Sequence, residues 1–324
     1  MEPGTELGVE MRYGKLIGIV AAFALTCGQA AWAGPVIIDG TDSNDHGSAS
    51  GSVNQDGWLY MQKALENLAS QVSGGVAKVV VNLGATNGGG SSDAFDAIHS
   101  AFSKSSLPGL GWSITDVDNV SGINAWLSSL ATSNTGILYI PTESLLTPSD
   151  LTNSEAAAVN SHATDINNFV AGPGNPLLGG ALFAQGENPG GGVDPYGWLK
   201  TLIPGISVTS LGGGGANTDL TLTAAGQAAF PGLTNADLSA GPWHDFFSGS
   251  LGGLSVLATA PESNKVGSPI RNVIIGGGAG TVIGCGGPGQ PPCDSNGVVP
   301  EPASIALLGL GGAMAAVIRR RKSA

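Results

Sequence analysis

The stretch from Ile137 to Glu187, ILYIPTESLLTPSDLTNSEAAAVNSHATDINNFVAGPGNPLLGGALFAQGE, decides the fold class. The apolar run over residues 136–142, which starts one residue before this stretch, predicts a buried strand. Residues 177–187 predict a second strand. Between the two, Thr152 to Glu155 reads as a capping box that starts a single helix, and Gly172-Pro173 predicts its end. A strand, a helix and a strand in this order are typical of parallel strands joined by a helical crossover.

The same alternation occurs before this stretch, and further strands follow it. We expect earlier strands at 36–39, 78–85 and 112–118, and later ones, some antiparallel, at 206–211, 219–225, 254–260 and 271–277. We expect earlier helices at 58–72, with Asp56 available as the cap, at 93–102 and at 123–130. The sequence therefore predicts an α/β domain over residues 34–275, with a mostly parallel sheet and helices on both faces, as in flavodoxin-like folds.

The order of elements in 137–187 also resembles the class I glutamine-amidotransferase-like fold. In that fold, the strand after the helix leads to a sharp turn that carries a catalytic cysteine. Phe183 to Glu187 contains no cysteine. The resemblance thus implies the fold without the amidotransferase activity.

The charge of the chain excludes nucleic acid as a partner. Residues 34–299 contain 20 acidic and 6 basic side chains, so the central region is strongly negative. Such a surface repels both nucleic acid and anionic lipid.

The amino-terminal segment, 1–33, reads as a secretory signal peptide. Arg12 and Lys15 precede the apolar run 16–25, and Ala31-Trp32-Ala33 places small residues where a signal peptidase reads, so cleavage is expected before Gly34. Three acidic residues precede Met11, which makes Met11 a candidate for the true start. The expected partner is a signal peptidase, and the expected route crosses the inner membrane.

The carboxyl-terminal segment, 300–324, predicts a sorting signal. Pro300-Glu301-Pro302 is an extended motif, 303–318 is an uncharged helix of about 24 Å, and a basic stop follows. The basic residues are Arg319, Arg320, Arg321 and Lys322. This arrangement resembles the PEP-CTERM sorting signal of Gram-negative bacteria. The resemblance implies recognition by an exosortase, a transient stay in the inner membrane and export to the cell surface or an exopolysaccharide matrix.

Residues 276–299 are rich in glycine and proline and predict a stalk between the domain and the sorting signal. Two cysteines, Cys285 and Cys293, remain after removal of the signal peptide. In an exported protein they are expected to form a disulfide, and a pair of free thiols is the alternative.

The loop after the first strand is the candidate binding site. Asp39, Asp42, Asn44 and Asp45 provide the oxygen ligands that calcium prefers, so the loop is a candidate metal site, although it lacks the downstream Glu of a calcium loop. The alternative is a solvated or self-hydrogen-bonded turn. No other cofactor is expected.

The sequence supports two classes of function. The first is a non-enzymatic surface or matrix protein that binds polysaccharide, with residues 243–247 as an exposed aromatic patch. The second is an exported hydrolase that uses Asp42, Asp45 and His46, with His244 and Asp245 as further candidates. The serine-hydrolase elbow fails at 47–51, because alanine occupies the nucleophile position. The hydrolase requires these groups to converge within about 3 Å of one another or of a shared water.

Overall fold

The computed structural model describes residues 34–72, 77–84, 93–130, 134–141, 150–171, 179–186, 193–211, 219–263 and 265–277. The predicted signal peptide with Ala31 and Ala33 and the sorting signal lie outside the described residues. The predicted stalk with Cys285 and Cys293 also lies outside them, except for residues 276 and 277, which end a strand. Within the described part, no helix is both long and apolar enough to cross a membrane.

The described residues form an α/β fold around one large sheet. Its parallel half has the order β5 (Ser113–Val117), β4 (Val79–Leu83), β6 (Ile137–Ile140), β7 (Ala181–Gln185) and β1 (Val36–Asp39). Its antiparallel continuation from β1 consists of β12 (Ile270–Gly277), β10 (Asp245–Gly249) and β8 (Ile206–Ser210). The strand β11 (Ser255–Pro261) pairs with β12 and with the short β9 (Thr221–Leu222).

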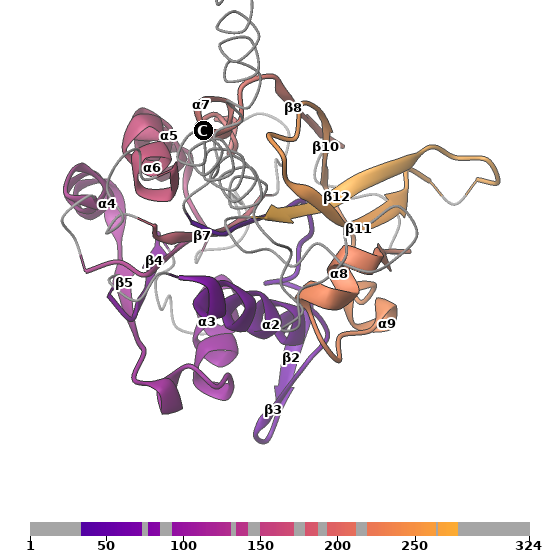
Figure 1. Cartoon of the computed structure of the whole chain (residues 1–324), viewed down its shortest axis with the longest axis horizontal. Helices are drawn as coiled ribbons and strands as arrows, with labels where there is room; N and C mark the ends of the chain where they lie inside the picture. The colour runs from indigo at the N-terminus through magenta and orange to yellow at the C-terminus, as the bar shows by residue number, and fades with distance from the viewer. Residues whose placement is uncertain are drawn as a thin grey trace, which may run out of the picture. The chain divides into compact units, whose positions relative to one another are not determined.

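Helices cover both faces of the sheet (Figure 1). One face carries α2 (Asp56–Gln71) and α3 (Asp93–Lys104), with α8 (Ala224–Ala229) and α9 (Asn235–Leu238) beside α2. The other face carries α4 (Asn119–Ser128), α5 (Asn153–Ser161), α6 (Ala163–Ala171) and α7 (Leu199–Leu202). A 3-10 turn, η1 (Pro108–Leu110), precedes β5, and a separate hairpin of β2 (Gly47–Ser50) and β3 (Val53–Gln55) precedes α2.

Alternate side chains of the central strands supply two cores, one on each face. On β1, Ile37 packs with the helices α2 and α3, whereas Val36 and Ile38 pack on the side of α4 to α7. The side chains of β6 and β7 divide in the same way. Burial on both faces explains why these strands are continuous apolar runs rather than alternating patterns. The α/β class and the mostly parallel sheet are therefore confirmed.

Three local predictions were wrong. The helix between β6 and β7 is two helices, α5 and α6, which break at His162. The imidazole of His162 contacts Asp165 Oδ2 through Nδ1 at 2.7 Å and Asn124 Oδ1 through Nε2 at 3.0 Å, so it ties the break to α4. Asp56 is not a cap, because α2 starts at Asp56 itself with φ of 57°, after Gln55 as N-cap. The segment 219–225 holds only β9 before α8 begins.

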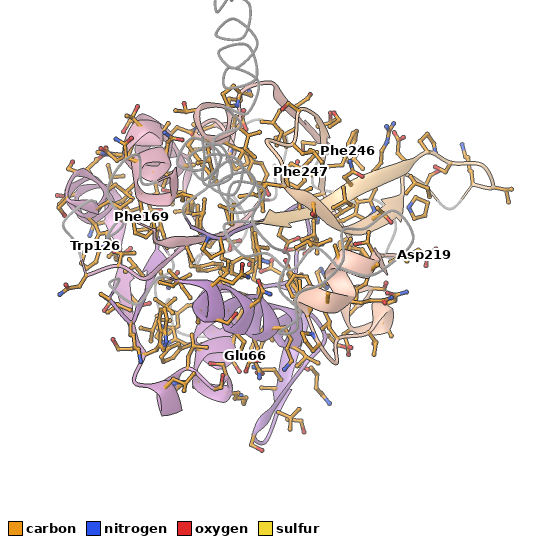
Figure 2. The ribbon with its side chains drawn as sticks, viewed as in Figure 1. Glu66, Trp126, Phe169, Asp219, Phe246 and Phe247 are labelled. Atoms are coloured by element: carbon orange, nitrogen blue, oxygen red, sulfur yellow. The ribbon has the colours of Figure 1, made fainter. Side chains whose placement is uncertain are left out.

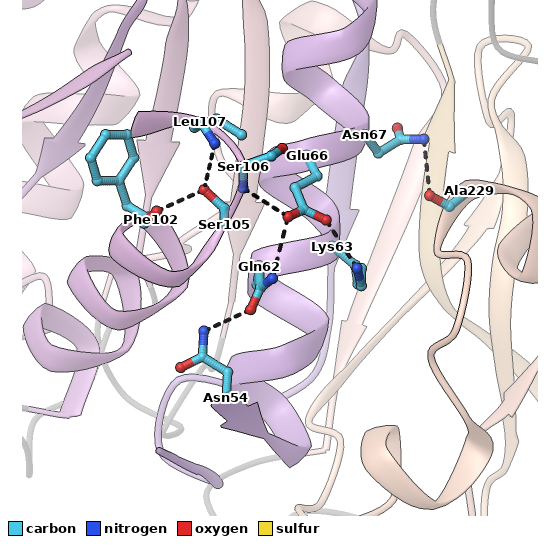
Figure 3. A network of polar contacts seen from close by, with 10 residues as sticks. All are labelled: Asn54, Gln62, Lys63, Glu66, Asn67, Phe102, Ser105, Ser106, Leu107 and Ala229. Atoms are coloured by element: carbon cyan, nitrogen blue, oxygen red, sulfur yellow. Dashed lines mark hydrogen bonds and ion pairs between the residues drawn. The ribbon is translucent and has the colours of Figure 1, made fainter. Parts of the chain in front are cut away.

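Polar contacts fix α2 against the segments around it (Figure 3). Glu66 accepts hydrogen bonds from Gln62 Nε2 at 3.2 Å and from the amide of Ser106, after α3, at 3.1 Å. It also pairs with Lys63 Nζ at 3.0 Å. Burial would raise the pKa of Glu66, but the contact with Lys63 and the two other donors lower it. These contacts hold in place the helix that carries Tyr60 towards the end of β1.

Candidate functional site

The site lies where the parallel strands β1 and β7 end side by side. Asp39 is the last residue of β1 and lies opposite Gln185, the last residue of β7. Both side chains are buried, with 0% and 1% of their surface exposed. In open α/β sheets, ligand sites form beyond the carboxyl ends of the strands. The sequence places the two residues 146 positions apart, so only the pairing of β1 with β7 brings them together.

Asp39 is a buried carboxylate held by neutral donors. Its Oδ1 accepts a hydrogen bond from Thr41 N at 2.8 Å, and its Oδ2 accepts from Thr41 Oγ1 at 2.9 Å and from Gln185 Nε2 at 3.0 Å. Burial disfavours the charged form and raises the pKa of Asp39 to about 7, although these hydrogen bonds act in the opposite direction. A carboxyl group that titrates near neutral pH is suited to acid–base chemistry.

Three buried tyrosines surround this carboxylate. Tyr139, on β6, donates its hydroxyl to Gln185 Oε1 at 2.7 Å. Tyr196 donates to the backbone oxygen of Asp39, and Tyr60 interacts electrostatically with the Asp39 carboxylate. Burial, together with the nearby carboxylates, raises the pKa of each tyrosine well above 10. All three phenols therefore stay protonated while Asp39 titrates.

The loop after Asp39 continues the network to Ser43. Thr41 Oγ1 and Ser43 Oγ share a short hydrogen bond, and Ser43 is only 4% exposed. Backbone contacts fix the loop, since Gly40 O accepts hydrogen bonds from the amides of His244 at 2.8 Å and Asp245 at 3.1 Å. A Cβ at Gly40 would lie 2.1 Å from the carbonyl oxygen of Asp245, so this close approach requires glycine.

Asp42 brings two of the predicted histidines together. Its Oδ2 lies 3.2 Å from His46 Nε2 and 3.4 Å from His244 Nε2. The side chains of Asp42 and His244 are buried, with 8% and 3% exposed, whereas that of His46 is 42% exposed. Burial alone would raise the pKa of Asp42, but the contacts with His244 and then His46 outweigh it and lower the pKa. Three of the five residues predicted for a hydrolase therefore converge.

The other two predicted hydrolase residues, Asp45 and Asp245, directly precede His46 and follow His244 in the chain, respectively. Asp45 Oδ1 accepts a hydrogen bond from Asn44 Nδ2 at 2.8 Å, and Asp245 begins β10 with its backbone amide bonded to Gly40. Asn44 Nδ2 also donates to Asp150 Oδ1 at 3.2 Å, and its backbone oxygen accepts from Trp58 Nε1 at 2.7 Å. These contacts hold Asn44 in place within the loop.

The four predicted metal ligands make different contacts, and two of them, Asn44 and Asp45, bind each other. Asp39 accepts from Thr41 and Gln185, Asp42 contacts the two histidines, and Asn44 directs its amide nitrogen, not its oxygen, to Asp45. Among the residues that the structure describes, no group of three or more His, Cys, Asp or Glu side chains could hold a metal ion. Calcium binding by this loop remains a prediction.

The predicted exposed aromatic patch at 243–247 is wrong. Trp243 is 0%, Phe246 7% and Phe247 1% exposed. Figure 2 labels Phe246 and Phe247 among the side chains of the ribbon. Phe246 and Phe247 are consecutive residues of β10 and pack into the cores on opposite faces of the sheet. Successive side chains of a strand point to opposite faces of the sheet, and here both faces are buried. In the sequence, this pattern resembles an irregular surface segment.

Sequence reasoning missed Thr41, Ser43, Gln185 and the three tyrosines. Gln185 had a signal, because a glutamine that ends the apolar run ALFAQ is a polar side chain at the carboxyl end of a buried strand. The hydroxyls of Thr41 and Ser43 lie between the acidic residues that drew attention. The tyrosines carry no local signal, since aromatic residues in such strands and helices are commonly core.

Comparison with known proteins identifies the tail and nothing else. Residues 298–322 match the PEP-CTERM protein-sorting motif. This motif marks an exported protein that an exosortase processes at the membrane and that then reaches the cell surface. No curated protein matches the chain. No solved structure matches it either, so the resemblance to the amidotransferase-like fold has no support from a known structure.

Proposed function

We propose that this chain is an exported surface protein whose folded α/β domain is retained in the exopolysaccharide matrix after exosortase processing. The observation that carries the proposal is the sorting motif at residues 298–322. The predicted signal peptide supports the same route, with Pro300-Glu301-Pro302 as the exosortase site and residues 319–322 as the membrane stop. The acidic domain supports a location away from anionic membrane lipid and nucleic acid, because like charges repel.

The test is the intact mass and the cellular fraction of the protein recovered from its native host. Loss of residues 1–33 and of the segment beyond Pro302, with the protein in the matrix fraction, is the expected result. A mass shift of about 2 Da on reduction would report the disulfide between Cys285 and Cys293. A Glu301→Ala variant should stay in the membrane fraction, whereas Glu262→Ala, which changes a surface ion pair of the folded domain, should be sorted normally. A membrane-bound wild-type protein that keeps residues 303–324 would refute the proposal.

A second candidate function is an exported hydrolase. The observation that favours it is the contact of Asp42 with both His46 and His244 at the end of β1. A histidine oriented by a buried carboxylate can take or give a proton at neutral pH, which is the basis of general acid–base catalysis. The adjacent Asp39 adds a second carboxyl group that exchanges its proton near pH 7.

This candidate is tested with a panel of chromogenic esters and glycosides on the purified full chain. Asp42→Asn should lower kcat/KM for any turned-over ester by about 100-fold or more, since general acid–base catalysis contributes about 10²–10⁴-fold. Asp165→Asn is the matched control, because it also removes the carboxylate partner of a histidine, His162, but at the break between α5 and α6. Equal rates for wild type and Asp42→Asn on every substrate would refute a hydrolase at this site.

A further inference from the structure

We propose that Ser43 is the nucleophile of an acyl-ester hydrolase, and that Asp39 is its general base, acting through the hydroxyl of Thr41. This inference rests on the hydrolase candidate and supplies the nucleophile that the sequence motifs fail to provide. The substrate class is an ester of a carboxylic acid. The proposal rests on a chain of two hydrogen bonds at the carboxyl end of β1. Ser43 Oγ is hydrogen-bonded to Thr41 Oγ1, and Thr41 Oγ1 is hydrogen-bonded to Asp39 Oδ2.

The direction of the hydrogen bonds follows from proton counting. A threonine hydroxyl has one proton to donate, and Thr41 Oγ1 donates it to Asp39 Oδ2 at 2.9 Å. In the shared bond between the two hydroxyls, Thr41 must then be the acceptor and Ser43 the donor. The proton of Ser43 therefore points along the path to Asp39, which leaves the lone pairs of Ser43 Oγ for an electrophile.

The base is held in place by groups that do not neutralise it. Thr41 N fixes Oδ1 of Asp39, and Gln185 Nε2 fixes Oδ2, while Tyr139 anchors Gln185 from β6. The donors in these hydrogen bonds are neutral, so burial makes this carboxylate a stronger base than a solvated one. A nucleophile, an adjacent proton acceptor and a third group that orients the acceptor constitute the usual arrangement for nucleophilic catalysis.

The reaction balances without any added oxidant, metal or cofactor. Ser43 Oγ forms a bond to the carbonyl carbon, its proton moves to Thr41 Oγ1, and the former proton of Thr41 moves to Asp39. The bond to the ester oxygen breaks, and the leaving alkoxide takes a proton back through Thr41. Water then attacks the acylated Ser43, gives one proton to the same path, and releases the acid as Ser43 regains its proton.

Ser43 lies at the edge of the sheet where ligand sites of open α/β folds form, and it is only 4% exposed. It belongs to the loop beyond the carboxyl end of β1, and it adjoins Asp42, which binds the exposed His46. Trp58 and the backbone of 244–245 fix both sides of the loop, so the hydroxyl is held rather than free to rotate away. Such preorganisation of a nucleophile lowers the entropy lost in the transition state.

The test uses a fluorophosphonate, which phosphonylates only activated serine hydroxyls and releases fluoride. Labelling of the purified full chain is followed by intact mass and by peptide mapping. One adduct on Ser43 is expected, and Ser43→Ala should abolish it. Ser48→Ala should leave labelling unchanged. Ser48 is exposed on β2, in the segment 47–51 that does not match the serine-hydrolase elbow, and it is not part of the hydrogen bonds between Ser43, Thr41 and Asp39. Thermal unfolding of each variant confirms that it is folded.

The proton path is tested at Thr41. Thr41→Val keeps the shape of the side chain but removes the hydroxyl, so it should slow labelling of Ser43 by about 100-fold or more. Thr41→Ser keeps the hydroxyl and should retain labelling within a few-fold of wild type. This pair also keeps the test valid if Ser43→Ala fails to fold. Equal labelling rates for Thr41→Val and wild type would refute the role of Asp39 as base.

The outcomes separate this inference from the hydrolase itself. No adduct on Ser43, or an adduct on another residue, refutes Ser43 as nucleophile. If ester hydrolysis that depends on Asp42 is still observed in that case, the hydrolase proposal is retained, with water rather than Ser43 attacking the ester directly. If neither labelling nor Asp42-dependent hydrolysis occurs, both the inference and the hydrolase are refuted.

Discussion

Replacing Asp39 with asparagine should change how the stability of the domain depends on pH. Burial raises the pKa of Asp39 in the folded state to about 7 from an ordinary value of 3.8. Between these two values the unfolded chain loses the proton while the folded chain keeps it. The free energy of unfolding therefore falls as pH rises from about 4 to about 7, and it levels off above that. At about 1.36 kcal/mol for each of about 3 units, the total loss is about 4 kcal/mol.

Asparagine cannot ionise in this range, so Asp39→Asn should lack this loss. Its carbonyl oxygen can still accept the hydrogen bond from Thr41 N, and a flip of the Gln185 amide can satisfy the new donor. At pH 4 the variant should be less stable than wild type by about 1 kcal/mol, the usual worth of a rearranged hydrogen bond. At pH 8 the order should reverse, because only wild type carries the buried charge.

The assay is urea unfolding of the full chain at several pH values from 4 to 8, followed by the fluorescence of the buried Trp198 and Trp243. The quantity of interest is the stability of wild type minus that of the variant, since the other titrating groups cancel in this difference. A difference that does not change between pH 4 and 8 would refute the account of Asp39.

Asp116→Asn is the matched control with the opposite sign. Burial would raise the pKa of Asp116, but hydrogen bonds from His99 and Asn82 outweigh it and lower the pKa. Its contribution to stability is therefore present above pH 3.8 and lost as pH falls through the lowered value. The Asp116→Asn variant should be less stable than wild type at neutral pH and should approach it only in acid.

Three further changes test the packing of the fold, each by the midpoint and slope of urea unfolding. Thr152→Ala removes the observed capping box of α5 and should cost about 1 kcal/mol, and full retention of stability would contradict that role. Phe183→Ala empties the core beneath α2 and should cost about 3–5 kcal/mol, whereas the exposed Val266→Ala should change stability by less than about 0.5 kcal/mol. Gly180→Ala places a methyl group 1.9 Å from the ring of Phe169 and should destabilise the fold. An unchanged free energy of unfolding would contradict this packing of Phe169 against Gly180.

Part of the candidate site could be predicted before the fold was known. An acidic loop directly after the strand Val36–Asp39 is readable as a ligand site, because a buried strand that ends in carboxylates points to the carboxyl edge of a sheet. The same reading named Asp42, His46 and His244, which the structure brings together. It failed at residues 243–247, where a buried strand resembles an irregular aromatic segment.

The sequence by itself determined the alternating strands and helices, the capping box at Thr152 and the sorting motif, because each depends on residues that are close together along the chain. Only the tertiary structure decided that Asp39 meets Gln185 and that Asp42 meets His244. It also decided that the predicted helix breaks at His162, whose imidazole contacts Asn124 on α4. The physical reason is that strand order and helix packing are set by the joint burial of distant apolar faces, which no local pattern encodes.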